Sequence, residues 1–399
     1  MKKLFALLLS LLLLAGCAAS PSSAEITEPT TGVSEPPTIS TTEAVPESKA
    51  PSEPDPVPAD SSFSIHFIDV GQADAALVEC DGSFMLIDGG NKEDSQIIYS
   101  VLKNAGADHL EIVVGTHGHE DHIGGLPGAY AYADAALTLC SVASYDSNAF
   151  EDFAEYARKR GGGITVPEVG ASYSLGSAKI TILGVNSTDE TNDTSIVLRI
   201  NYGSTSFLFT GDAEWDAEQT ILASGADLSA TVLKVGHHGS ETSTGYQFLR
   251  AVSPHYAVIS VGEGNEYGHP TEAVLSRLQD ADVTVFRTDI QGDIYCTSDG
   301  ESVIFRVDRN QEADTLKGAG IDGSRDETPE SANSENAVTV SEDNKDSATT
   351  YICNANTGKF HYPDCSSVKQ MSEKNKLEVT EDRDRLVAQG YDPCGKCNP

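Results

Sequence analysis

The densest group of metal-binding side chains is the segment 116–122, which reads Thr-His-Gly-His-Glu-Asp-His. It contains three of the ten histidines and directly follows an apolar run that ends at Gly115. Neutral imidazole and carboxylate are the ligands that zinc and similar divalent cations select, and loops that leave strand ends are where rigid folds hold ligands. The segment therefore predicts a metal site instead of a solvated polar loop.

Four further donors each stand just beyond another apolar run. They are Asp212, His237, His238 and His269. Taken singly, such residues more often cap a helix or turn the chain. Strands of one sheet bring their ends to one edge, however, so these side chains are expected to converge with those of the first segment. Together the donors predict a site for two metals.

Around these donors the sequence predicts alternating short strands and helices. The predicted strands are 64–69, 75–79, 84–88, 111–115, 179–183, 195–201, 206–210, 231–235, 256–261, 283–286, 294–297 and 302–307. The predicted helices are 95–106, 216–224 and 246–252. Two β-rich halves with interspersed helices predict an α/β fold in which two packed sheets are covered by helices.

Several motifs resemble one known family. The His-x-His-x-Asp-His string at 117–122, Gly-Asp at 211–212 and His-His-Gly-Ser at 237–240 are similar to the metallo-β-lactamase superfamily. The strings at 67–74, 86–90 and 267–270 narrow the resemblance to the extracytoplasmic hydrolase domain of ComEC, a DNA-uptake competence protein. It covers about residues 63–307 and implies the αββα sandwich of that superfamily. The ComEC membrane channel has no counterpart here, so transport is not expected.

The resemblance also implies a ligand set. The implied ligands are His117 and His119 for one metal and Asp121 and His122 for the second, with Asp212 bridging and His237 or His269 completing the set. Superfamily members usually carry one more histidine between these motifs, whereas residues 123–211 contain none. ComEC-like proteins share this gap and have an Asn-rich turn, matched here by 192–195. The two cations are expected to be zinc or manganese, and Asp69 and Asp88 are expected to orient ligand histidines.

A dinuclear site of this kind predicts hydrolysis of a phosphoester. Two cations about 3.5 to 4 Å apart polarise a phosphoryl oxygen and lower the pKa of a shared water. Asp121 and Asp212 are catalytic in this scheme because they hold the cations. His238 is a candidate proton donor to the leaving oxygen if His237 is the ligand, and Lys234 is a candidate for stabilising developing charge.

The first residues resemble a bacterial lipoprotein signal peptide, spanning 1–17. Two lysines precede an apolar run over 4–15 that is too short to span a bilayer. The run ends in Leu-Ala-Gly-Cys, which resembles a lipobox, so Cys17 is the expected lipidation site. An ordinary signal peptide with an incidental cysteine is the alternative. Both alternatives predict export, and the first predicts an extracytoplasmic protein that is lipid-anchored to the bacterial cell membrane.

Composition divides the rest of the chain into four parts. They are a disordered linker rich in Pro, Ser, Thr and Glu at 18–60, the hydrolase domain at 61–308, an acidic disordered linker at 309–349 and a small C-terminal module at 350–399. The two linkers lack the apolar period that a packed core requires.

The C-terminal module contains two closely spaced pairs of donors. They are His361-x3-Cys365 and Cys394-x2-Cys397. Four such donors are sufficient for one tetrahedral structural zinc, which a segment this small needs because its core is minimal. The alternative is two disulfides using Cys353, since an exported protein meets an oxidising compartment. The string at 359–365 resembles the Ada-like metal-binding modules appended to exported bacterial nucleases.

Charge bears on the substrate. The chain has a formal net charge of −35, and residues 61–309 contain 13 Lys or Arg against 36 Asp or Glu. Such a surface repels long polyanions unless a local patch or bound cations intervene. Residues 350–399 contain 7 basic and 7 acidic residues, so this module is where a nucleic acid or wall polymer is expected to touch.

These features favour a phosphodiesterase that acts on nucleic acid, most simply a DNase. The acidity favours an alternative, an esterase of a smaller phosphoester, since phosphorylcholine esterases of teichoic acid resemble this domain. A non-catalytic surface binding protein is a third alternative, which the intact ligand set disfavours. The expected partners are therefore a phosphoester substrate, DNA or wall teichoic acid, and the membrane through a lipid anchor only. No obligate protein partner is implied.

Overall fold

A computed structural model describes residues 57–317, 349–354, 358–371, 376–381, 383, 386, 391–394, 396, 397 and 399. The predicted signal peptide, with Cys17, lies outside the described residues. So do most of the predicted linkers at 18–60 and 309–349. No helix in the described ranges is long and apolar enough to cross a membrane.

Two sheets form the main domain. The first has the strand order β15 (Val303–Val307), β14 (Ile294–Ser298), β1 (Phe63–Phe67), β2 (Ala75–Cys80), β3 (Ser83–Gly89), β4 (His109–Gly115), β5 (Asp134–Cys140) and β6 (Ile164–Thr165). The second has the order β13 (Thr284–Arg287), β12 (Tyr256–Ile259), β11 (Val232–Lys234), β10 (Thr205–Phe209), β9 (Val197–Tyr202), β8 (Ala178–Gly184) and β7 (Ser172–Leu175). Strands β10 to β13 are parallel, so their carboxyl ends share one edge.

The two sheets pack face to face over one apolar core. Alternate residues of β1 point into it, and the ring of Phe63 stacks on that of Phe207 with centroids 4.8 Å apart. The ring of Phe67 stacks on Phe209 at 5.8 Å. Burial of these rings, together with the aliphatic side chains around them, stabilises the contact between the two sheets.

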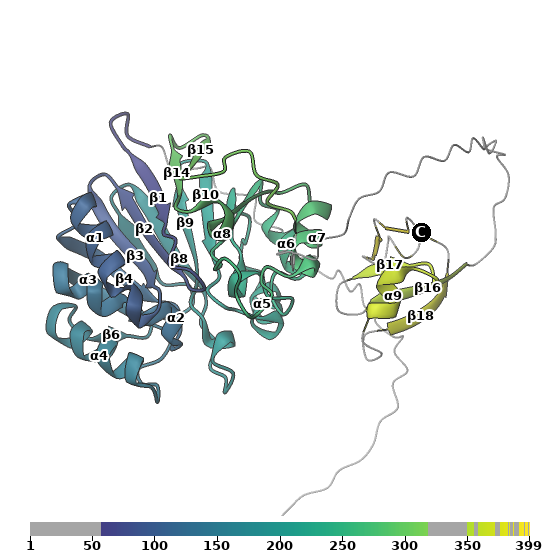
Figure 1. Cartoon of the computed structure of the whole chain (residues 1–399), viewed down its shortest axis with the longest axis horizontal. Coiled ribbons are helices and arrows are strands. Elements are labelled where there is room, and N and C mark those ends of the chain that lie inside the picture. Colours follow the sequence, from purple (N-terminus) through teal and green to yellow (C-terminus); the bar gives the residue numbers. More distant parts are fainter. Residues whose placement is uncertain are drawn as a thin grey trace, which may run out of the picture. The chain divides into compact units, whose positions relative to one another are not determined.

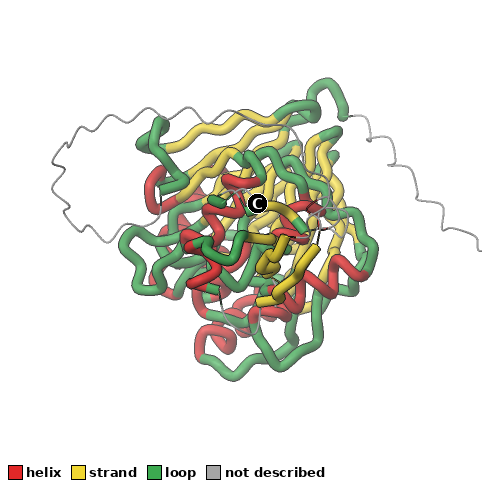
Figure 2. The backbone as a smooth tube through the Cα atoms, turned by 90° about the vertical axis from the view of Figure 1, so that its right-hand side faces the viewer, coloured by secondary structure: helices red, strands yellow, loops and turns green. Residues whose placement is uncertain are grey.

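Helices cover the outer face of each sheet. Those on the first sheet are α1 (Ser95–Ala105), α3 (Leu126–Tyr132) and α4 (Asn148–Arg160). Those on the second are α5 (Trp215–Ala223), α6 (Tyr246–Val252) and α7 (Glu272–Asp280). Figure 1 shows the two sets on opposite sides of the strands, and Figure 2 shows the strands side by side with helices and loops around them. The predicted αββα sandwich is confirmed.

Five short helical elements complete the main domain. They are η1 (Lys92–Asp94), α2 (Glu120–Ile123), η2 (Asn192–Thr194), η3 (Gly236–Gly239) and α8 (Thr288–Gln291). The packed chain also extends beyond the expected boundary at 308. The Thr315 hydroxyl donates to the carbonyl of Val285 at 2.7 Å, and Arg287 donates to the carbonyl of Lys317 at 2.6 Å. Residues up to 317 therefore belong to this domain.

The C-terminal module has its own small sheet. Its strand order is β18 (Lys376–Glu381), β16 (Thr349–Asn354), β17 (Lys359–His361) and β19 (Asp392–Pro393), and α9 (Ser366–Gln370) follows β17 in the chain. Among its described residues, one apolar cluster consists of Tyr351, Cys353, Phe360 and Leu386, and a second of Cys365, Val368 and Cys394. Clusters of this size are small for a stable core, so the module needs further stabilisation.

Candidate metal centre

The predicted donors lie together in the loops that follow β4 of the first sheet and β10 and β11 of the second. One group consists of Asp121, His122, Asp212 and His238, whose ligand atoms all lie within 4.8 Å of one another. His122 Nε2 is 3.2 Å from Asp212 Oδ1, and His238 Nε2 is 3.2 Å from Asp121 Oδ2. Two imidazoles and two carboxylates at these separations match the ligands that zinc and manganese select.

Unpartnered atoms in this group test whether a cation fits. His122 Nε2 and Asp212 Oδ1 are both buried, and neither makes a hydrogen bond of good geometry although they lie 3.2 Å apart. Buried polar atoms nearly always have a partner, and a divalent cation would satisfy both. The residues therefore fit a divalent cation.

A second set of donors adjoins the same carboxylate. His117 Nε2 is 3.0 Å from His119 Nδ1 and 3.9 Å from Asp212 Oδ2. His237 Nε2 approaches the same Asp212 oxygen at 3.7 Å. Asp212, which is 2% exposed, thus adjoins both sets of donors. Its Oδ1 lies 3.2 Å from His122, and its Oδ2 lies 3.9, 3.7 and 3.8 Å from His117, His237 and His238. This is the arrangement that a bridging carboxylate requires.

His238, not His237, lies in the group with Asp121 and His122. The expectation was that His237 or His269 completes the ligand set and that His238 gives a proton to the leaving group. His269 is 8% exposed, its ring lies 5.7 Å from that of His237, and its Nδ1 has no hydrogen-bond partner. His269 therefore lines the site beside His237 and stands outside the close group.

Asp88 holds His122 in place, as expected. Its carboxylate accepts the backbone N–H of Thr116 at 2.7 Å and the Thr116 hydroxyl at 2.8 Å, and it lies 2.9 Å from His122 Nδ1. The Nδ1–H of His122 therefore donates to Asp88, which leaves Nε2 to face the site. Asp69 does not share this role, because its carboxylate accepts from Gly71 and pairs with Arg309.

The carbonyl of Ser260 accepts the Nδ1–H of His238 at 3.0 Å. Asp74, which was not among the predicted site residues, lies beside the same ring. Its Oδ1 lies 3.3 Å from His238 Nδ1, and its Oδ2 lies 2.8 Å from the ammonium of Lys234. Lys234 is 4% exposed and also donates to the carbonyl of Val235 at 3.0 Å. Its role is therefore to fix Asp74, not to meet the developing charge of a substrate. The only available sequence signal was the position of Asp74 in the motif at 67–74.

The loop that carries His237 and His238 is strained. Both residues have left-handed backbone conformations, with φ of 48° and 52°. Non-glycine residues in this region cost on the order of 1 to 3 kcal/mol each, so the surrounding structure must hold them. His238 Nδ1 lies 3.0 Å from the carbonyl of Ser260, and His237 Nδ1 lies 3.1 Å from Glu214 Oε1.

The turn at 192–195 supports both sets of donors. Asn192 donates to Glu214, the residue that holds His237, at 3.2 Å. The Ser195 hydroxyl accepts the backbone N–H of Asp212 at 3.1 Å and lies 3.4 Å from His117 Nδ1. Gly211 allows this close approach, since a Cβ there would lie 2.9 Å from that of Thr116. The turn that stands where the superfamily has a histidine thus orients ligands from this position.

Carboxylates govern the protonation of the buried histidines. Burial opposes the charge on His122 and His238, but Asp212 with Asp88 raises the pKa of His122, and Asp212 with Asp74 raises that of His238 to about 10. Burial lowers the pKa of His117 well below its usual value. The site therefore has excess negative charge that protons balance and that a cation can balance instead.

Glu218→Gln is expected to remove a pH-dependent loss of stability. The Glu218 carboxylate accepts the backbone N–H groups of Thr244 and Gly245, which follow the histidine loop. Burial raises its pKa from 4.5 to about 8, so the folded protein binds this proton more tightly than the unfolded chain. The contribution of the protonated Glu218 side chain to the free energy of unfolding is complete below pH 4.5. It is lost as the pH rises to about 8, by at most about 1.4 kcal/mol per pH unit.

Thermal unfolding at about pH 5 and about pH 9 measures this effect. Between these two pH values, the melting temperature of wild type is expected to fall further than that of Glu218→Gln. An equal loss in both proteins would show that Glu218 does not change its protonation on folding.

The family model of the metallo-beta-lactamase superfamily matches residues 68–263. These residues therefore form a domain of the metallo-beta-lactamase superfamily. The relatives that the chain matches include a ComE operon protein and a competence protein. It is 29% identical over 254 residues to ComE operon protein 3 of Bacillus subtilis, covering 59% of this chain and 33% of that protein. It is 32% identical over 241 residues to competence protein ComA of Neisseria gonorrhoeae, covering 60% of this chain and 33% of that protein.

The chain thus spans one third of the length of these relatives. Among solved structures, the metallo-beta-lactamase fold protein YhfI from Bacillus subtilis aligns with a TM-score of 0.39 and 14% identity. That alignment covers 56% of this chain and 95% of YhfI.

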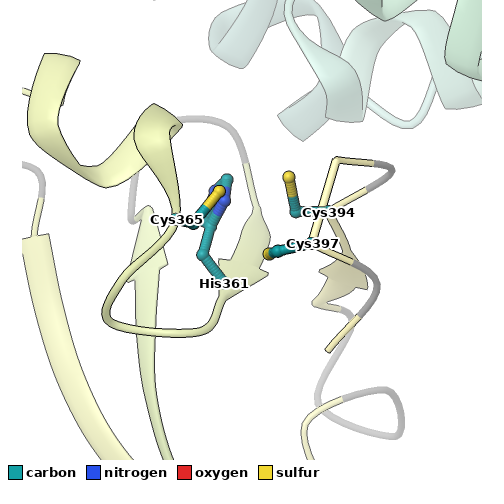
Figure 3. A group of neighbouring side chains, drawn as sticks. All are labelled: His361, Cys365, Cys394 and Cys397. Atoms are coloured by element: carbon teal, nitrogen blue, oxygen red, sulfur yellow. The ribbon is translucent and has the colours of Figure 1, made fainter. Parts of the chain in front are cut away.

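The C-terminal module holds a separate group of donors. Figure 3 shows His361, Cys365, Cys394 and Cys397 converging, and their ligand atoms lie within 4.8 Å of one another. Burial lowers the pKa of His361, and its Nδ1 is buried without a hydrogen-bond partner. Cys365, Cys394 and Cys397 form no disulfide, so the structure does not adopt the disulfide alternative. Three thiols and one neutral imidazole fit a tetrahedral zinc.

Proposed function

We propose that this chain is an exported, membrane-anchored phosphodiesterase that hydrolyses nucleic acid, most simply DNA. The observation that carries the proposal is the pair of donor sets on the two sides of Asp212. Two cations about 3.5 to 4 Å apart suit in-line displacement at a phosphoryl group. Relatives named for competence support DNA as the polymer, because competence is the uptake of DNA.

We assign each donor to one cation. His117, His119 and His237 would hold one cation, Asp121, His122 and His238 would hold the other, and Asp212 would be shared between them. The assignment follows the distances between these side chains and replaces the expectation that His238 is a proton donor. Zinc and manganese both accept this mixture of imidazole and carboxylate.

The chain's own groups prepare the site. When bound, two divalent cations polarise a phosphoryl oxygen and lower the pKa of a water molecule. Asp88 accepts the Nδ1–H of His122 and the carbonyl of Ser260 accepts that of His238, so that each imidazole presents Nε2. Ligand imidazoles must be neutral, and carboxylates raise the pKa of both histidines. Binding of cations is therefore expected to release protons.

A substrate screen tests the proposal. Residues 18–399 would be incubated with plasmid, single-stranded DNA, RNA and bis-(p-nitrophenyl) phosphate, each with Zn²⁺, Mn²⁺ or Mg²⁺. Cleavage of DNA and of the small diester that depends on the cation is expected. Cleavage of none of the four would contradict the proposal.

One observation favours a second candidate, an esterase of a smaller phosphoester such as the phosphorylcholine ester of teichoic acid. Residues 61–309 contain 13 basic against 36 acidic residues, so a long polyanion is repelled from much of this domain. The screen separates the candidates when p-nitrophenyl phosphorylcholine is added to it. Rapid cleavage of that ester with no cleavage of DNA would favour the esterase.

Cys17→Ser is expected to release the protein into the medium. The apolar run at 4–15 is too short to span a bilayer, so a diacylglycerol group on Cys17 is the expected anchor. Membrane and culture fractions would be compared by immunoblotting. A variant that stays in the membrane with its signal uncleaved would mean that the anchor is something else.

A further inference from the structure

Tyr267 is the most exposed of the large apolar side chains that the structure describes. It is 73% exposed, compared with 69% for the next, Ile304. Single exposed aromatic residues are common on protein surfaces and need no function. The setting of Tyr267, not its exposure alone, is what calls for an explanation.

The loop that carries Tyr267 is tied down. Asn265 Oδ1 accepts the backbone N–H of His269 at 3.0 Å, and Asn265 Nδ2 donates to the carbonyl of His269 at 2.6 Å. The backbone N–H of Gly262 donates to Gln72 Oε1 at 3.1 Å, which joins this loop to the one that leads to Asp74. A ring held by such a loop can receive a ligand with little loss of conformational entropy.

Three rings form a row between solvent and Asp212. The ring of Tyr267 stacks on His269 with centroids 5.8 Å apart and planes at 27°. His269 lies edge-on to His237 at 5.7 Å. His237 Nε2 is 3.7 Å from Asp212 Oδ2. The exposed face of Tyr267 therefore lies at the rim of the candidate metal centre.

The charge of the domain adds a second reason for an uncharged contact. Its acidic residues outnumber its basic ones by 36 to 13 over residues 61–309. Lys234, the lysine of the site, is buried against Asp74 and does not face a substrate. Contacts with a phosphate backbone are thus poor, whereas stacking of a base on an aromatic ring needs no positive charge.

We propose that Tyr267 is a substrate-binding residue on which a nucleobase next to the scissile phosphate stacks, so that the substrate class is a nucleoside phosphodiester. This rests on the proposed phosphodiesterase function. His269 supports the Tyr267 ring from beneath, and its buried Nδ1, which has no partner, lies within the same row.

Two esters with the same leaving group test the inference. Residues 18–399 and the variants Tyr267→Ala and Tyr267→Phe would be assayed on the p-nitrophenyl ester of thymidine 5′-phosphate and on ethyl p-nitrophenyl phosphate. Tyr267→Ala is expected to lower kcat/KM about tenfold on the nucleoside ester, within the range measured for base stacking. It is expected to leave the ethyl ester nearly unchanged, and Tyr267→Phe is expected to retain both activities.

Tyr156→Ala is the matched control, since Tyr156 is an exposed tyrosine on α4, 38% exposed. Equal loss on both esters, or no loss on either, would overturn the role of Tyr267. A separate calorimetric titration with thymidine 5′-monophosphate and with ethyl phosphate, in the presence of Mn²⁺, measures binding without turnover. If wild type hydrolyses neither ester, the proposed function is wrong, and the titration still decides whether Tyr267 binds the base.

Discussion

Asp212→Ala is expected to lower kcat/KM on a small phosphodiester at least about a thousandfold, or roughly 4 kcal/mol of transition-state stabilisation. Asp212 is the carboxylate that adjoins both donor sets, at 3.2 Å from His122 Nε2 and 3.9 Å from His117 Nε2. Its removal takes a ligand from both cations at once. Steady-state kinetics together with metal analysis measure the effect.

Asp189→Ala is a suitable control, because Asp189 is an exposed carboxylate in a loop outside the donor sets. It is expected to retain wild-type kinetics. His119→Ala is expected to abolish hydrolysis as well, since its cation already lacks the histidine that the superfamily usually supplies. Near-wild-type turnover of Asp212→Ala with unchanged metal content would rule out the two-metal scheme.

Cys394→Ser is expected to abolish metal binding by the C-terminal module and to unfold it, while hydrolysis of a small diester by the main domain persists. The apolar core of the module is small, so binding of zinc supplies most of its folding free energy, which in comparable peptides is about 10 to 16 kcal/mol. Loss of one of four ligands removes much of that energy. Retained hydrolysis is expected because an acidic segment of the chain, 318–348, separates the module from the main domain.

Cobalt distinguishes the two metal sites within the full chain. Cysteine ligands give a thiolate-to-cobalt absorption that the imidazole and carboxylate donors of the main domain cannot give. The absorption is expected in wild type and in Cys353→Ala, which alters the module core outside the ligand set, and to vanish in Cys394→Ser. Its absence in wild type, together with a mass that shows two disulfides, would mean that the module is held by disulfides.

The elements that flank the donor motifs were predicted almost residue for residue. The predicted helix at 246–252 is α6 (Tyr246–Val252), and the predicted strand at 75–79 is β2 (Ala75–Cys80). These segments carry a strong apolar period and end at glycine or turn residues. The spacing of apolar residues and the residues that end a helix or strand are local properties, so a single sequence reveals them.

The segment between the first donor motif and β8 received no predicted elements, although it contains α3, β5 and α4. α4 is rich in charge, and only Phe150, Phe153 and Ala157 with Ala149 form its buried stripe. So narrow an apolar stripe does not indicate a helix in the sequence alone. Its role is clear only when it is seen packed on the sheet. α7 (Glu272–Asp280) was missed for the same reason, since its buried face includes Arg277, whose guanidinium binds the carbonyl of Ser243.

Which residues can bind metal follows from the amino-acid sequence, because the types and spacing of imidazole, carboxylate and thiol donors are properties of the chain. How the donors divide into two sets depends on the fold. His237 and His238 are neighbours, and their left-handed backbone sends one ring toward Glu214 and the other toward Asp74. In the sequence, Lys234 likewise has the pattern of a cation that can face a substrate. In the structure it is paired in the interior with Asp74, which lies 160 residues away in the chain. The direction of a side chain and its partner depend on contacts between distant segments, which no local pattern contains.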